Sequence, residues 1–291
     1  MKRTVASVAL TACVVTGLVS AQTQAVKKSG APVQPTHATA TDKARAKRST
    51  ERTLRFITDS DSPPFSFKKG LERMGFEIDL TEAIGNEIGA KIKWIEMNFG
   101  VNAYASALDR KQADAAISSI SITADRKDRL AFTRPYYRAG FAIAVQKDVD
   151  WEHQWFTSGL EGWKIGVMRG TTGERWARDN LAGKIETYAN VDRLVQALKN
   201  SKGALKSGRA GFCILHDETI LKWLLSDYSY RYQIPEKKIA REYYGIAVSK
   251  NNPKLLTEIN AALENLRKNG TYKKIYKNWY KEAEDMPMFE K

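Results

Sequence analysis

The chain has 291 residues, of which 43% are hydrophobic and 27% are charged, and this composition excludes a largely disordered or collagen-like protein. The length allows two lobes with separate cores. The formal net charge of +14 suggests an anionic partner, but about +6 of it lies between Gln22 and Arg55 and +2 comes from Lys2 and Arg3. The remaining excess is spread over the whole body of the chain, so we expect no nucleic-acid partner.

Residues 1–21 read MKRTVASVALTACVVTGLVSA, with two basic residues ahead of an apolar run that ends in small residues. This pattern is typical of a secretory signal peptide, and we expect cleavage after Ala21. An alternative is a lipoprotein signal, because LTAC at residues 10–13 resembles a lipoprotein box in which Cys13 is lipidated. Either signal places the mature protein outside the cytoplasm, secreted or periplasmic. Cleavage after Ala21 leaves Cys213 alone, so that no intramolecular disulfide can form.

Residues 22–52 are rich in Ala, Thr, Lys, Arg, Ser and Pro and nearly lack large apolar side chains. Such a segment buries too little apolar surface to offset the entropy lost on ordering. We therefore expect a disordered basic tether, whose charge suits contact with the anionic headgroups of a membrane surface.

From residue 53 onward, strand patterns alternate with helix patterns, and this alternation predicts an α/β fold with mixed, mostly parallel sheets. Alternating or short continuous apolar runs predict strands at 53–58, 91–97, 114–122, 130–147, 163–168, 210–215 and 243–250. Apolar residues at helical spacing predict helices at 76–89, 102–111, 171–181, 191–200, 217–228, 253–270 and 271–283. Thr171 and Glu174 are expected to form a capping box at the start of the helix at 171–181.

Polar side chains gather at three expected strand-to-helix junctions. These are SISITADR at 119–126, VMRGTTGE at 167–174 and CILHDE at 213–218. Ligands in open α/β sheets bind beyond the carboxyl ends of strands, near the starts of helices. Each junction has an ordinary structural explanation, but together the three predict one cleft.

Several segments carry a resemblance to a known family: SPPFSF, MGFEIDLTEAIG, ADAAISSISITADRKDRLAFTRPYY, WKIGVMRGTTGE, YYGIAVSK and INAALENLRKNGTYKKIYKNWY. In this order and spacing, the chain from about Thr53 to Ala283 resembles the extracytoplasmic solute-binding proteins of ABC importers for polar amino acids. Within that family, FCILHDETIL is most similar to the glutamine-binding branch.

The resemblance implies a type II periplasmic-binding-protein fold with two lobes, each a mixed sheet flanked by helices, joined by two crossover segments. Lobe one is expected at 53–136 and 246–286, and lobe two at 137–245. The implied function is capture of a free polar amino acid, with glutamine as the leading candidate, and its delivery to the membrane permease of an ABC importer. We expect a monomer that needs no cofactor and no metal.

A ligand carboxylate that enters a closed cleft needs a forked cation and several hydrogen-bond donors. Arg126 offers the fork, Ser121 offers a hydroxyl, and the amides of residues 171–172 lie at an expected helix N-terminus. The resemblance implies that this end of the ligand is bound by Ser119, Ser121, Arg126 and Thr172, and Thr171 joins these candidates through its place at the helix N-terminus. The bland alternative is that Thr123 caps a helix and Arg126 is a solvated surface residue.

The ligand ammonium needs an anion, and the resemblance assigns that role to Asp217. The local pattern also predicts that Asp217 caps the helix that follows, and the two roles are compatible. His216, directly before it, either reaches the ligand side chain or has a structural role.

The side-chain end of the pocket departs from the family pattern. Asp59 matches a position that hydrogen-bonds a polar or cationic ligand side chain. Ser62 stands where the family usually has an aromatic ring, and Phe99 is expected to supply the opposite wall. Met168 stands where the glutamine-binding branch has a lysine. A further departure is Gly211 in place of aspartate, for which we expect a structural consequence only.

The stretch at 200–208 resembles an insertion, and we assign it no function. Two functions other than amino-acid import remain possible for the chain. The missing ring and lysine favour a sensor or interaction protein that keeps the fold without transporting anything. Some relatives of the fold are dehydratases, so an enzyme is the other alternative. Against an enzyme, the sequence shows no nucleophile–base motif, no metal-spaced His/Cys cluster and no glycine-rich phosphate loop.

Overall fold

The computed structural model describes residues 52–149, 160–201, 211–235 and 239–280, all within the unit Lys47–Lys291. The expected signal peptide, nearly all of the expected tether, most of the 200–208 stretch and residues 281–286 lie outside the described residues. Arg52, which the sequence analysis placed at the end of the tether, is the first residue of a strand.

The first sheet is mixed and has the strand order β5-β1-β6-β14-β7. Strand β1 runs parallel to β5 and β6, whereas β14 runs antiparallel to β6 and β7. The strands are β1 (Arg52–Thr58), β5 (Ala90–Glu96), β6 (Ala115–Ala116), β7 (Leu130–Phe132) and β14 (Ala247–Ser249). A small antiparallel sheet follows β1 and consists of β2 (Asp61–Ser62), β3 (Ser66–Lys69) and β4 (Glu72–Met74).

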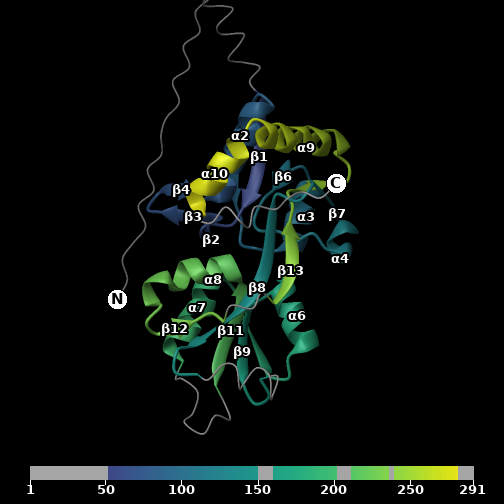
Figure 1. Ribbon diagram of the computed structural model, residues 1–291. Coiled ribbons are helices and arrows are strands. Elements are labelled where there is room, and N and C mark those ends of the chain that lie inside the picture. The colour runs from purple at the N-terminus through teal and green to yellow at the C-terminus, as the bar shows by residue number, and fades with distance from the viewer. Residues whose placement is uncertain (1–51, 150–159, 202–210, 236–238, 281–291) are drawn as a thin grey trace, which may run out of the picture. The chain divides into compact units, whose positions relative to one another are not determined.

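Helices pack against both faces of the first sheet (Figure 1). They are α2 (Phe76–Glu87), α3 (Val101–Asp109), α4 (Ala124–Lys127) and α9 (Pro253–Lys268). Helix α10 (Thr271–Trp279) packs on α2 and α9. Phe56 and Ile57 are neighbours on β1 and fully buried, but they belong to different apolar clusters. Because successive side chains of a strand point to opposite faces, the continuous apolar run of β1 fits a strand that is covered on both sides.

The second sheet has the order β10-β9-β11-β8-β12, and β13 also pairs with β8. Its strands are β8 (Tyr137–Gln146), β9 (Lys164–Met168), β10 (Lys184–Tyr188), β11 (Phe212–Asp217), β12 (Tyr232–Gln233) and β13 (Ile239–Tyr244). The helices on this sheet are α6 (Thr172–Asn180), α7 (Val191–Asn200) and α8 (Glu218–Leu225), the last continued by the 3₁₀ turn η1 (Ser226–Tyr228).

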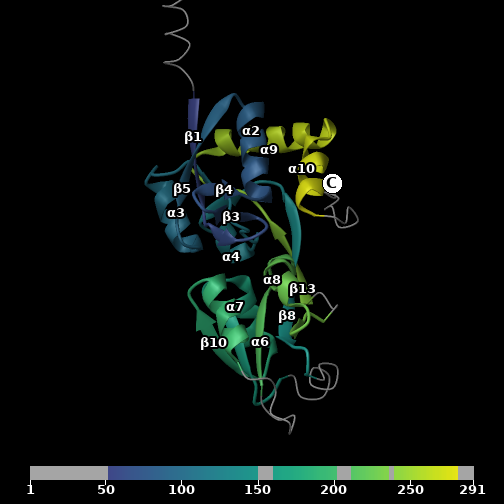
Figure 2. The same cartoon turned by 90° about the vertical axis from the view of Figure 1, so that its left-hand side faces the viewer.

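Strands β8 and β13 connect the two sheets. They run antiparallel, with Tyr137 opposite Tyr244, so the chain leaves and re-enters the first sheet side by side (Figures 1 and 2). Two mixed sheets, each with its own helices, joined by two crossovers confirm the expected two-lobed α/β fold. The expectation of mostly parallel sheets is wrong, because β8, β12, β13 and β14 all pair antiparallel.

Glycine at position 75 allows α2 to begin tightly against the hairpin that precedes it. Gly75 has φ of +137°, and a Cβ atom there would lie 2.0 Å from the carbonyl oxygen of Phe65. The amides of Phe76 and Glu77 donate to the carbonyls of Pro64 and Phe65, each at 2.9 Å. Backbone carbonyls thus replace a side-chain cap at this helix start.

Three aromatic rings meet where the first lobe faces α8. Phe67 of β3 lies 6.0 Å from Trp223 of α8 and 5.9 Å from Trp279 of α10, and the two tryptophan rings lie 6.3 Å apart between centroids.

Within the described ranges, no helix has both the length and the apolar character needed to cross a bilayer.

Candidate functional site

One pocket collects residues from both lobes. Its walls come from the ends of β9 and β11, from the segments that follow β1, β5, β6, β9 and β11, and from strands β8 and β13. All ten residues that the sequence analysis singled out line it: Asp59, Ser62, Phe99, Ser119, Ser121, Arg126, Thr171, Thr172, His216 and Asp217. The predicted junctions therefore do form one site, while the binding role of each residue stays a prediction.

Arg126 is buried in this pocket, with only 7% of its surface exposed, so the alternative of a solvated arginine is wrong. Its guanidinium donates to the carbonyl oxygens of Ser121, at 2.9 Å, and Gly170, at 3.4 Å. Burial lowers the pKa of Arg126, which nevertheless remains a cation at physiological pH. Thr123 precedes α4, but its hydroxyl makes no capping hydrogen bond.

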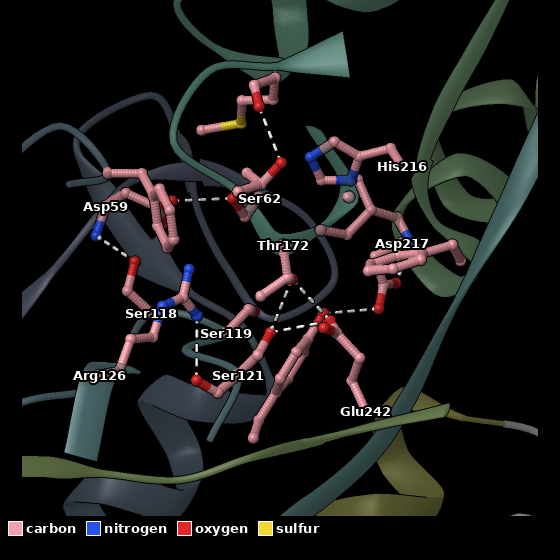
Figure 3. Close-up of a pocket in the computed structure, with 17 residues that line it drawn as sticks. Asp59, Ser62, Ser118, Ser119, Ser121, Arg126, Thr172, His216, Asp217 and Glu242 are labelled. Carbon is pink, nitrogen blue, oxygen red and sulfur yellow. Dashed lines mark hydrogen bonds between the residues drawn. The ribbon is translucent and has the colours of Figure 1, made fainter. Parts of the chain in front are cut away.

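Two hydroxyls face each other across the pocket, one from each lobe. Ser121 Oγ and Thr172 Oγ1 lie 3.2 Å apart. Both donate to the same carboxylate oxygen of Glu242, at 2.8 and 2.9 Å, as Figure 3 shows. Glu242 belongs to the crossover strand β13, and the sequence analysis did not single it out.

Ser119 is held in an unusual conformation by a buried acid. Its φ is +49°, and both its amide and its hydroxyl donate to Glu77 Oε1, at 2.7 and 3.1 Å. The hydroxyl of Tyr136 donates to the same oxygen. Burial raises the pKa of Glu77 to about 7, although these donors act against that rise. The side chain of Ser119 is therefore engaged with Glu77, and this contact fixes the turn that presents Ser121.

Thr171 caps α6, as predicted. Its Oγ1 accepts from the amide of Glu174 at 3.1 Å and donates to the carbonyl of Met168 at 2.7 Å. The second half of the expected capping box is shifted, because Glu174 accepts from the amide of Gly170 instead of that of Thr171. The helix N-terminus, with its favourable potential for anions, points at the Arg126 end of the pocket.

Asp217 caps α8 and also lines the pocket, as the sequence predicts for this residue. Its Oδ1 accepts from the amide of Ile220 at 3.0 Å, and its Oδ2 accepts from the hydroxyl of Tyr244 at 2.7 Å. Only 4% of its surface is exposed, and this burial raises its pKa to about 6. A carboxylate in this setting gains from a cation placed beside it.

Asp59 and Ser62 form the opposite end of the pocket. Ser62 donates to Asp59 Oδ2 at 2.9 Å, while the buried Oδ1 has no hydrogen-bond partner among the described residues. Burial raises the pKa of Asp59 well above its usual range, and the nearby acids Asp61 and Glu77 raise it further. An unpaired buried oxygen of this kind is a vacant acceptor for a donor group on a ligand.

Phe99 and Met168 supply the apolar part of the wall. His216 lines the pocket between the lobes, and neither of its ring nitrogens has a hydrogen-bond partner in the described part of the chain. Burial lowers its pKa to about 4, so its imidazole is neutral near pH 7. Figure 3 places it beside Asp217 and above Thr172.

Part of the lining was not predicted from the sequence: Ser118, Phe141, Gly173, Ile220, Glu242 and Tyr244. Ser118 adjoins the predicted motif and supports the Asp59 end, where its Oγ accepts from the amide of Asp59 at 3.3 Å. Tyr244 lies in the YYGIAVSK segment that carried the resemblance. Glu242 had no signal of its own, because the pairing of β13 with β8 decides which way it points.

The pocket is acidic. Asp59, Asp217 and Glu242 line it, against the single guanidinium of Arg126. No group of three or more His, Cys, Asp or Glu side chains is placed to hold a metal ion in the part of the chain that the structure describes.

The chain is similar to known proteins over most of its length. The sequence model of the family described as bacterial extracellular solute-binding proteins, family 3, matches residues 54–282. The L-arginine-binding protein of Pseudomonas aeruginosa is 29% identical over 239 residues, 79% of this chain and 88% of the relative. The ABC transporter glutamine-binding protein GlnH of Bacillus subtilis is 30% identical over 258 residues, 81% of this chain and 88% of the relative.

A solved structure, described as an ancestral arginine-binding protein bound to glutamine, has 35% sequence identity and a TM-score of 0.69. The match covers 80% of this chain and all of that one.

Proposed function

Because the chain belongs to the bacterial extracellular solute-binding proteins, family 3, we propose that it captures a free amino acid outside the cytoplasm and delivers it to the permease of an ABC importer. Relatives named for amino-acid binding, one of them in an ABC transporter, support this role over the sensor and enzyme alternatives. The proposed lobes are residues 53–136 with 246–286, and residues 137–245.

A single observation carries the proposal: one pocket holds a buried guanidinium at one side and a buried carboxylate at the other. Arg126, with the hydroxyls of Ser121 and Thr172 and the N-terminus of α6, would bind the ligand carboxylate. Asp217 would bind the ligand ammonium. A zwitterion pairs both groups at once, and this pairing offsets the desolvation penalty of each.

The excess of negative charge in the pocket indicates which ligand side chains it would accept. The sequence alone favours glutamine, but three carboxylates face one guanidinium, and no lysine lines the described pocket. A cationic side chain would neutralise Asp59 and fill its vacant acceptor, whereas an acidic side chain would add a fourth carboxylate. We therefore place arginine ahead of glutamine, and both ahead of glutamate.

A thermal-shift screen of the twenty standard L-amino acids tests the function, followed by calorimetry on each amino acid that binds. A ligand that binds only the folded protein raises its stability by mass action. Arg126→Ala should weaken binding by roughly 2–5 kcal/mol, because the ligand carboxylate loses its buried partner. Arg193→Ala, which removes an exposed arginine of α7 outside the pocket, should bind like the unmodified protein. Undiminished affinity after Arg126→Ala would contradict the proposal.

A further inference from the structure

The side chain of Glu242 already lies where the proposed ligand would put its carboxylate. Its Oε2 atom accepts hydrogen bonds from Ser121 at 2.8 Å and from Thr172 at 2.9 Å. These are the two hydroxyls that we assign to the ligand, and Figure 3 shows all three side chains converging on one point. The pocket thus holds a carboxylate of its own at its anion-binding end.

Ligand and Glu242 cannot use these hydroxyls together. A serine or threonine hydroxyl carries one proton and can donate it to only one strong acceptor at a time. A second carboxylate at the same donors would also meet the first at close range, and like charges in a desolvated site disfavour each other strongly. One of the two carboxylates must therefore leave or become protonated when the other binds.

The neighbouring cations attract Glu242 without locking it in place. Arg126 and Arg175 both favour its ionised form, while burial disfavours that form. Among the described residues, however, no ion pair joins either arginine to Glu242: Arg126 donates to backbone carbonyls, and Arg175 pairs with Asp125 at 2.8 Å. The guanidinium of Arg126 thus remains able to turn toward an arriving carboxylate.

The surroundings of Glu242 do not enclose its side chain fully. It is only partly buried, and it lies between exposed Arg241 and exposed Tyr243 on the crossover strand. The pairing of β13 with β8 is irregular just before it, between Ile239 and Arg241, where Ala240 has φ of +55°. A long side chain at such a position can swing toward solvent by changing its rotamers alone.

We propose that Glu242 is a built-in competitor that occupies the carboxylate subsite of the empty protein and is displaced by the ligand, so that it lowers affinity for every amino acid the pocket accepts. This inference rests on the proposed function. It gives a residue of the crossover strand control over how tightly the ligand is held and how readily it is released.

The test compares the unmodified protein with Glu242→Gln and with the matched control Glu186→Gln. Glu186 belongs to β10 of the same lobe, pairs with Lys164 and does not line the pocket. Each protein is screened with the twenty standard L-amino acids by thermal shift, and dissociation constants are measured by calorimetry at pH 7.5. Glu242→Gln should bind about tenfold tighter or better, because removing a like charge strengthens binding of the ligand carboxylate, and Glu186→Gln should be unchanged.

A second readout separates competition from a structural role. If Glu242 only supported the fold, its replacement would lower both the stability of the empty protein and the affinity. Competition predicts instead that affinity rises, while the melting temperature of the empty variant stays or rises, because burial already disfavours the ionised form of Glu242. The gain should also shrink when Ser121→Ala is combined with Glu242→Gln, because the contested hydroxyl is then gone.

The outcomes separate this inference from the proposed function. An amino acid that binds the unmodified protein and binds Glu242→Gln equally or more weakly overturns the competitor, while capture itself stands. Binding that appears only in Glu242→Gln supports the competitor in its strongest form. No binding of any of the twenty amino acids to either protein overturns both proposals.

Discussion

At the scale of single residues, Asp217 shows how a site can cost stability. Its carboxyl is buried and has a pKa of about 6 in the folded protein, against roughly 3.9 in an unfolded chain. Between these two values the folded state binds more protons than the unfolded state, so stability falls as the pH rises through this window. Above about pH 6 the full penalty of burying the ionised acid is present in the empty protein.

Asp217→Asn should therefore stabilise the empty protein at pH 8 by about 1–3 kcal/mol, since roughly two pKa units correspond to that range. An asparagine oxygen can still accept from the amide of Ile220, so the cap of α8 is kept. The same variant should lose amino-acid binding, because no anion remains for the ammonium. Urea unfolding at pH 8 and pH 4, with calorimetry at pH 8, measures both effects.

The stabilisation should vanish near pH 4, where most of the folded wild type is already protonated at this position. A variant that is less stable at pH 8, or that still binds its amino acid with unchanged affinity, would contradict this account of Asp217.

At the scale of elements, the start of α2 depends on one glycine. An alanine at position 75 would place its Cβ 2.0 Å from the Phe65 carbonyl oxygen, at a φ of +137° that L-residues rarely adopt. We expect Gly75→Ala to destabilise the protein by about 2 kcal/mol or more, because the backbone of the hairpin must shift. Amino-acid binding should weaken too, since α2 carries Glu77, which holds Ser119.

Gly89, just past the other end of the same helix, supplies the matched control. Its φ is +66°, but a Cβ atom there meets nothing within 4 Å. Gly89→Ala should therefore cost only about 1 kcal/mol for the left-handed backbone. Equal losses for the two variants in urea unfolding would show that the contact with Phe65 is unimportant.

Helices were the most predictable elements, and the turn at the site was the least. The apolar spacing of 253–270 and the capping pattern at Thr171 predicted α9 and α6 closely. The strand expected at 114–122 is instead the two-residue β6, after which the chain turns into the pocket. That turn needs the positive φ of Ser119, which contact with Glu77, 42 residues earlier, stabilises. The sequence around Ser119 alone cannot reveal a contact with a residue so far away in the chain.

The predicted site residues came from polar motifs at strand ends and from a resemblance, and both are readable in sequence. Glu242 was not readable, since it lies in an ordinary stretch and its direction follows from the register of β13 on β8. The small sheet of β2, β3 and β4 was also not expected, because its strands are too short to show a period. Gly211 did prove structural: a Cβ there would lie 2.7 Å from the buried ring of Trp163.

At the scale of the whole molecule, capture of the ligand should depend on pH. Asp217 must be ionised to bind the ammonium, and its pKa is about 6 in the empty protein. Below pH 6 the dissociation constant should rise by about tenfold per pH unit, because one proton must leave before the ligand binds. Asp59, whose pKa is also raised, should act in the same direction for a cationic ligand.

Calorimetry from pH 5 to pH 8 in the Glu242→Gln variant measures this dependence without the opposing titration of Glu242. His216 should contribute nothing in this range, since its pKa of about 4 keeps it neutral. A dissociation constant that is flat between pH 5 and pH 8 would show that Asp217 is not the partner of the ammonium.

The tryptophans that meet near Phe67 give the molecule a built-in optical signal. Trp223 belongs to a helix of one lobe and Trp279 to a helix of the other, yet their ring centroids are 6.3 Å apart at an angle of 48°. Electronic transitions of indoles this close couple, and the coupling changes with their spacing and tilt. Near-ultraviolet circular dichroism of the unlabelled protein should therefore report any change in the alignment of α8 and α10 as the solute enters and leaves.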